Sequence, residues 1–77
     1  PADGAPSVLE RAIGQQTVDA YERALQRLTE KQRNAVVLRI EFDMTYPEIA
    51  LELDAESTDA ARMLVVRGLA ELTRRMQ

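Results

Sequence analysis

The clearest helical pattern in the chain begins at Thr45. Thr45 and Glu48 form a Thr-x-x-Glu capping box, and Pro47 stands in the first turn, where its missing N–H costs nothing. Apolar residues then recur at i, i+3, i+4 and i+7: Tyr46, Ile49, Ala50 and Leu53. This spacing predicts a short helix with one apolar stripe.

A second helix follows after a very short turn. Asp54-Ala55-Glu56 leaves room only to reverse direction, and aspartate tolerates the left-handed conformation that such turns often need. Ser57 or Thr58 can cap the next helix, and Asp59 suits the positive end of its dipole. The pair predicts a helix-turn-helix at about residues 45–76, an arrangement whose second helix can enter a DNA major groove.

The last helix has two distinct faces when its residues are placed at 100° steps. The inner face is predicted to hold Ala61, Val65, Gly68, Leu72 and Met76, with Leu64 and Leu69 at its margins. Gly68 weakens a helix, so we expect it to allow close helix packing. The outer face collects Asp59, Arg62, Met63, Val66, Arg67 and Arg74. Single exposed apolar groups are ordinary, but apolar side chains beside arginines can also contact thymine methyls while arginine reads guanine.

The first part of the chain predicts one helix or two. Residues 1–6 are small, polar and broken by Gly and Pro, and we interpret them as the end of a linker before a single helical domain at 7–77. A capping box at Ser7 starts a helix that Gly14 is expected to end or weaken. Residues 17–28 form an amphipathic helix, and the pattern leaves open whether it continues from the first.

Residues 33–42 are apolar on nearly every side. The capping box from Thr29 to Gln32 precedes them and favours a helix, while a buried strand over 36–42 is the alternative. A helix that is apolar all round is buried or covered by a partner. The fold class is therefore all-α, a small bundle of four or five helices. The predicted core is Val18, Tyr21, Leu25, Leu28, Val36, Val37, Ile40, Ile49, Ala50, Leu53, Ala61, Val65 and Leu72.

The amino-acid composition disfavours several classes of function. The chain of 77 residues has no cysteine and no histidine, which removes the commonest metal ligands and the commonest general base. No Gly-rich loop can cradle a nucleotide phosphate, and hydroxyl residues stand where caps belong, so we expect no cofactor, no small-molecule substrate and no enzyme. Without a signal peptide or an apolar run of spanning length, we expect no membrane contact and a cytoplasmic protein.

The net charge of −3 disfavours nucleic acid, yet the charge is uneven. Residues 1–56 carry six basic and eleven acidic side chains, whereas residues 57–77 carry four basic and two acidic ones. The segment that is predicted to contact DNA, residues 57–77, therefore carries a positive net charge.

Residues 17–76 resemble region 4 of bacterial sigma factors, and most closely the extracytoplasmic-function group. Leu-Thr-Glu-Lys-Gln-Arg at 28–33, Tyr-x-Glu-Ile-Ala at 46–50 and Asp-Ala-Ala-Arg-Met at 59–63 carry the resemblance. The Tyr-x-Glu-Ile-Ala motif occurs in many helix-turn-helix families, and its combination with the upstream motif makes the match specific. Two departures are Asp54, where a turn glycine is usual, and a 54–59 segment one residue longer than in the housekeeping group.

The resemblance implies a domain that recognises the upstream, or minus thirty-five, promoter element. It implies docking on the β flap of RNA polymerase and, in many members, capture by an anti-sigma factor. By position, the resemblance assigns these residues to DNA: Thr45 and Tyr46 near phosphate, and Ser57, Thr58, Arg62, Met63, Val66 and Arg67 in the groove. The alternatives are the helix-turn-helix domain of another regulator, such as the LuxR type, and a helical module that binds only protein.

Overall fold

The computed structural model describes residues 8–77, with side chains from Gly14 onward, and this range contains helices and no strand. The helices are α1 (Val8–Gln26), α2 (Glu30–Ile40), α3 (Tyr46–Glu52) and α4 (Thr58–Met76). The all-α prediction is confirmed with four helices, and helix α2 excludes the strand alternative. The linker expected at residues 1–6 and the cap expected at Ser7 lie outside the described residues. None of the described helices combines the length and apolarity needed to cross a membrane.

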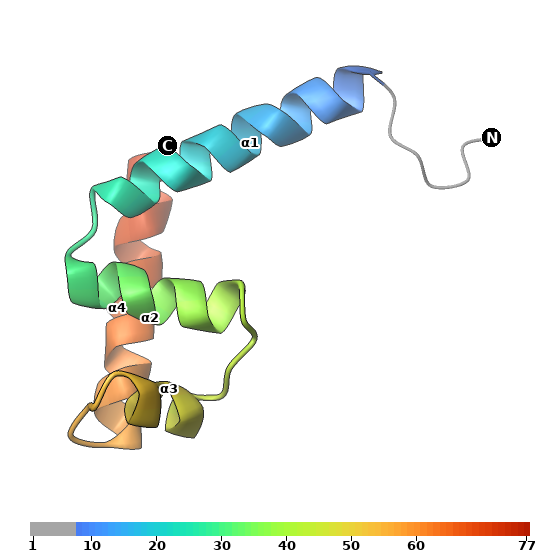
Figure 1. Cartoon of the computed structure of the whole chain (residues 1–77). Coiled ribbons are helices and arrows are strands. Elements are labelled where there is room, and N and C mark those ends of the chain that lie inside the picture. The colour runs from blue at the N-terminus through green and yellow to red at the C-terminus, as the bar shows by residue number, and fades with distance from the viewer. Residues whose placement is uncertain (1–7) are drawn as a thin grey trace.

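Helix α4 is the element that all the others contact. Figure 1 shows α2 crossing the middle of α4, with α3 beside the N-terminal half of α4 and α1 near its C-terminal end. The N-terminal half of α1 extends away from the other helices (Figure 1). The short α3 therefore depends on α4 and α2 for its position.

Capping side chains begin three of the helices, as the sequence predicts. The Thr45 hydroxyl accepts a hydrogen bond from the backbone N–H of Glu48 at 3.3 Å, and the Glu48 carboxylate accepts one from the Thr45 N–H at 2.8 Å. The bond from the Thr45 backbone N–H first, and the Thr45 side chain second, hold the pKa of the Glu48 carboxyl below its ordinary value. Thr29 and Gln32 repeat this arrangement at α2, and Ser57 caps α4 through the N–H three residues on, at 3.0 Å.

Glycine and aspartate have specific roles in the backbone. Helix α1 runs through Gly14 without a break, which settles the question that the sequence left open. Asp43 and Asp54 both adopt the left-handed conformation, each with φ of 53°. The expectation for Asp54 is therefore confirmed, and the N–H of the next residue closes the turn by donating to the Ala50 carbonyl at 2.8 Å. Aspartate at these two positions joins α3 to its neighbours.

The core consists of two apolar clusters. The first joins α1, α2 and α4 through Ala24, Leu25, Leu28, Val36 and Leu72. The second joins α2, α3 and α4 through Ala35, Ile49, Ala61 and Val65. Leu69 of α4 packs against both clusters. Four other predicted core residues are partly buried against these clusters: Tyr21, Val37, Ala50 and Leu53.

Gly68 lies where α4 passes closest to α2. A Cβ atom at this position would lie 2.6 Å from Val36 Cγ2 and 3.1 Å from the carbonyl oxygen of Gln32. Any larger residue would push the two helices apart, because one of these contacts is backbone. The expected packing role of Gly68 is confirmed.

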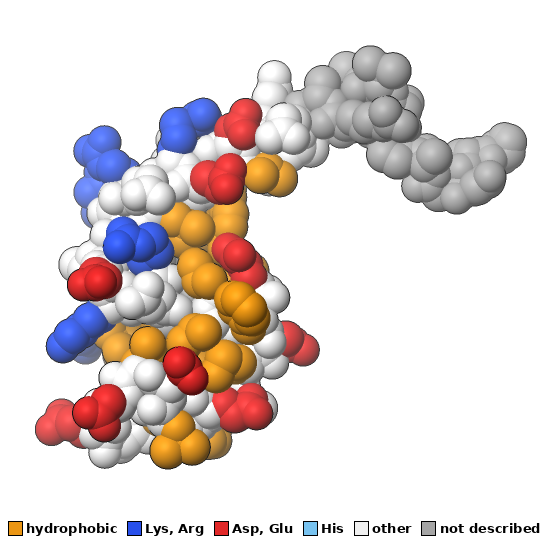
Figure 2. Space-filling view, viewed as in Figure 1, with side chains coloured by type: hydrophobic (Ala, Val, Ile, Leu, Met, Phe, Trp, Pro, Cys, Tyr) orange, Lys and Arg blue, Asp and Glu red, His pale blue; other side chains and the backbone are white. Residues whose placement is uncertain are grey.

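Three predictions of burial were wrong. Val18 is 48% exposed, and the residues of α1 that are buried in the first cluster begin only at Ala24. Ile40 is 52% exposed as the last residue of α2, and Met76 is 36% exposed at the end of α4. Figure 2 shows that hydrophobic side chains form a band on one face of the molecule. The helical repeat of apolar residues continues beyond the end of the neighbouring helix, so the apolar side chains there are exposed to solvent.

Replacing Gly68 by alanine should destabilise the domain, although alanine is the better helix former. Overpacking against α2 should cost about 1–3 kcal/mol, measured by chemical denaturation. Gly14→Ala is the matched control, because no atom lies within 4 Å of a Cβ there. It should instead strengthen α1 by about 0.5–1 kcal/mol. Equal effects of the two substitutions would contradict the close approach at Gly68.

Ile49→Ala should cost about 2–5 kcal/mol of unfolding free energy, because Ile49 is completely buried in the second cluster. Leu51→Ala, on the same helix, removes a side chain that is 85% exposed and should leave the melting temperature nearly unchanged. Thermal melts of the two variants compare burial within a single helix. A stable Ile49→Ala variant would show that α3 does not need this contact.

Candidate nucleic-acid interface

The outward face of α4 follows from the residues that it buries. Ala61 and Val65 are fully buried against α2 and α3. Arg62 and Val66 each follow one of these buried residues, so they lie about 100° further round the helix, and both are exposed, Val66 by 42%. Thr58, the first residue of α4, is also exposed. This surface is the one on which the sequence places groove contacts.

Arg62 has a partner on its own helix. Its Nε and NH2 groups both donate to Asp59 Oδ1, at 3.1 and 2.8 Å. Both side chains are well exposed, so the pair contributes little to stability and exchanges partners readily. The pair places a guanidinium beside a carboxylate in the first turns of α4.

Met63 and Arg67 occupy a different flank of α4. They line a hollow of about 610 Å³ together with Lys31 and Asn34 of α2. The turn between α3 and α4 closes one end of this hollow, through residues 53–56. Lys31 and Arg67, from helices far apart in the sequence, therefore line one hollow together with the acidic Glu30, Asp54 and Glu56.

Thr45 and Ser57 both use their hydroxyl oxygens as helix caps. A hydroxyl oxygen that accepts in this way belongs to a group that also carries one O–H donor. Tyr46 is partly buried in the second cluster, and the guanidinium of Arg39 lies 5.1 Å from the centre of its ring. Arg39 also donates to the carbonyl of Met44 at 2.9 Å, which fixes a cation near the start of α3.

The structure thus divides the predicted site residues among three places. Arg62, Val66 and Thr58 share the outward face of α4, Met63 and Arg67 line its flank, and the remaining three stand at helix starts. Sequence reasoning missed Asp59 as a partner of Arg62, although the i,i+3 spacing of opposite charges signals it. It also missed Lys31 and Arg39, whose positions depend on how the helices pack. Among the residues whose side chains are described, no cluster of three or more His, Cys, Asp or Glu could hold a metal ion.

Two helices joined by a short turn, with a buried inner face and a charged outer face on the second, define a helix-turn-helix DNA-binding domain. The family model described as sigma-70, region 4, matches residues 19–72, which is most of the chain. The chain belongs to this family of non-enzymatic, DNA-binding domains of sigma factors. Neither the curated proteins nor the solved structures contain a match. The resemblance to sigma region 4 is confirmed, and the narrower extracytoplasmic-function assignment stays a prediction.

Proposed function

We propose that this domain recognises the minus thirty-five promoter element with the N-terminal half of α4 in the major groove. The exposed outward face around Arg62 is the observation that carries this proposal. The first turns of a recognition helix usually meet base edges, and Arg62 stands in the second turn after the Ser57 cap. A guanidinium can donate to N7 and O6 of guanine, and Val66 offers apolar contact to a thymine methyl.

The Asp59 pair suits this role for Arg62. On binding, Arg62 exchanges an exposed ion pair for a charge-assisted bond to a base, so little stability is lost. The nearby carboxylate repels phosphate, which favours base edges over backbone for this arginine. Thr45 and Ser57, at the starts of α3 and α4, supply contacts that fix register on the backbone.

We also propose that the exposed apolar band docks on the β flap of RNA polymerase. Val18, Ile40 and Phe42 are 48%, 52% and 66% exposed, and Tyr21 and Val37 lie between them against the first cluster. The Tyr21 hydroxyl donates to Glu41 at 2.9 Å and ties α1 to the end of α2. Burial, with Glu41 second, raises the pKa of Tyr21 to about 12 and keeps this donor protonated.

A contiguous apolar surface of this kind marks a protein interaction site. These residues lie on α1, on α2 and in the segment that follows α2, and none of them belongs to α4, the helix proposed to meet DNA. The net-acidic domain should bind DNA weakly alone, and docking on polymerase would raise its effective concentration at the promoter. An anti-sigma partner stays an expectation from the family resemblance.

Arg62→Ala should flatten base preference at one or two positions of the promoter element, because about 1–3 kcal/mol of discrimination depends on a bidentate pair. Arg62→Lys keeps the charge without the planar fork, so it should retain backbone affinity but lose the preference. A series of promoter variants, bound by the full polymerase complex, measures both effects. Unchanged preference in both variants would refute α4 as the reader of sequence.

Phe42→Asp should weaken assembly with RNA polymerase while leaving the melting temperature nearly unchanged, because the side chain is exposed. Leu51→Asp is the control, since it places the same charge at an exposed leucine outside the band. Binding of each variant to core polymerase is measured by fluorescence anisotropy. The comparison distinguishes a loss that is specific to the band from a general effect of the added charge. Equal losses in both variants would count against the band as the docking site.

A further inference from the structure

Five arginines gather where the C-terminal half of α4 passes the end of α1 and the start of α2. We call them the basic edge: Arg23, Arg27, Arg67, Arg74 and Arg75. Arg27, Arg67 and Arg74 line one hollow with Thr29 and Gln32. Arg27 also lines the next hollow, together with Arg23 and Arg75. Arg27 therefore joins two hollows into one continuous surface.

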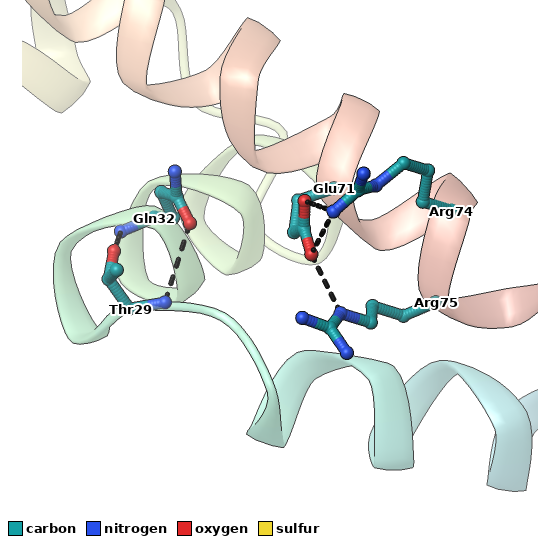
Figure 3. Close-up of polar contacts among 5 residues, drawn as sticks. All are labelled: Thr29, Gln32, Glu71, Arg74 and Arg75. Atoms are coloured by element: carbon teal, nitrogen blue, oxygen red, sulfur yellow. Dashed lines mark hydrogen bonds and ion pairs between the residues drawn. The ribbon is translucent and has the colours of Figure 1, made fainter.

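Half of the ten basic residues of an acidic chain lie on this edge. Glu71 is the acidic residue that lines these two hollows. It accepts hydrogen bonds from Arg75 Nε at 2.7 Å and from Arg74 NH2 at 2.8 Å, and these arginines hold the pKa of its carboxyl below the ordinary value. Figure 3 shows that the guanidinium groups of Arg74 and Arg75 both contact Glu71, close to the start of α2.

The other three arginines are not paired with Glu71. Among the residues whose side chains are described, Arg23, Arg27 and Arg67 form no ion pair. The hollow beside Met63, which Arg67 also lines, contains Glu30, Asp54 and Glu56. In the two hollows of the basic edge, by contrast, one carboxylate stands against five guanidinium groups. Such a surface favours a ligand with regularly repeated negative charge.

The basic edge is continuous with the flank of α4 that adjoins the face proposed to read DNA. Arg67 lines both the hollow beside Met63 and the hollow that contains Arg27 and Arg74. Along α4, Arg74 stands about 18 Å from Arg62, at about 1.5 Å per residue. This separation places Arg74 beyond base edges but beside the backbone that borders the groove. An isolated acidic protein surface would not require this continuity, so duplex DNA is the better fit.

We propose that the basic edge binds the phosphodiester backbone of the promoter duplex outside the base pairs that α4 reads. This inference rests on the proposed function of α4. The guanidinium groups of Arg27 and Arg67 donate to phosphate oxygens, for which their planar fork is suited. Glu71 holds Arg74 and Arg75 in place and limits how strongly they attract phosphate.

The test uses the full-length protein assembled with RNA polymerase and a promoter duplex at a series of salt concentrations. Arg27→Gln and Arg74→Gln should each weaken binding to preferred and altered promoters alike. Arg27→Gln should lower the slope of log affinity against log salt by about 0.9, the value for one phosphate contact, and Arg74→Gln should lower it by less, because Glu71 already pairs with Arg74. Between about 50 and 200 mM salt, the unsubstituted protein should lose about threefold more affinity than Arg27→Gln.

Two further variants sharpen the result. Glu71→Gln should act in the opposite direction, because it releases Arg74 and Arg75 to phosphate and steepens the salt dependence. Arg33→Gln is the matched control, since Arg33 lies on α2 but lines a separate hollow with Glu52 and Leu53. It should leave the slope unchanged. A salt slope for Arg27→Gln equal to that of the unsubstituted protein would overturn the proposal.

A modified duplex identifies the ligand. When the phosphates beside the recognised bases are replaced by neutral methylphosphonates, the unsubstituted protein and Arg27→Gln should bind equally. A deficit of Arg27→Gln that persists on this duplex would overturn the DNA assignment and indicate an acidic protein surface. Failure of the proposed function looks different, because the unsubstituted protein would then bind preferred and altered promoters with equal affinity.

Discussion

The close approach of α4 to α2 at Gly68 is the contact on which the rest of the structure depends. Because there is no side chain at this point, Val36 and the backbone of Gln32 can lie directly against α4. The next residue, Leu69, packs against both apolar clusters. Residues 8–77 of this 8.7 kDa chain thus form four helices with two small clusters that meet at one crossing. The same crossing determines which face of α4 is buried and which face is exposed to solvent.

Local patterns predicted the helices well because their starting signals lie within a few residues of one another. The boxes at Thr29 and Thr45 and the cap at Ser57 each need only the next three residues, and the structure contains all three. The outward face of α4 was predicted for the same reason, since the helical period alone separates Arg62 from Ala61.

The errors arise where local pattern meets tertiary structure. Val18 and Ile40 continue a helical period, but no partner helix covers them. Ala24 and Ala35 are buried and were missed, because a small side chain gives a weak apolar signal. The hollow that brings Lys31 to Arg67, and the one that brings Arg27 to Arg74, could not be predicted from the sequence, because each joins residues more than thirty positions apart.

The uneven distribution of charge bears on how fast the domain can find a polyanion, rather than on how tightly it holds one. At physiological salt an exposed charge is screened beyond about 8 Å. The electrostatic force on an approaching duplex therefore comes from the nearest charged side chains and not from the net charge of −3. The acidic surface repels the duplex, whereas the arginine-rich side attracts it. The protein is therefore rotated into a productive orientation during encounter, and its association rate should fall as ionic strength rises.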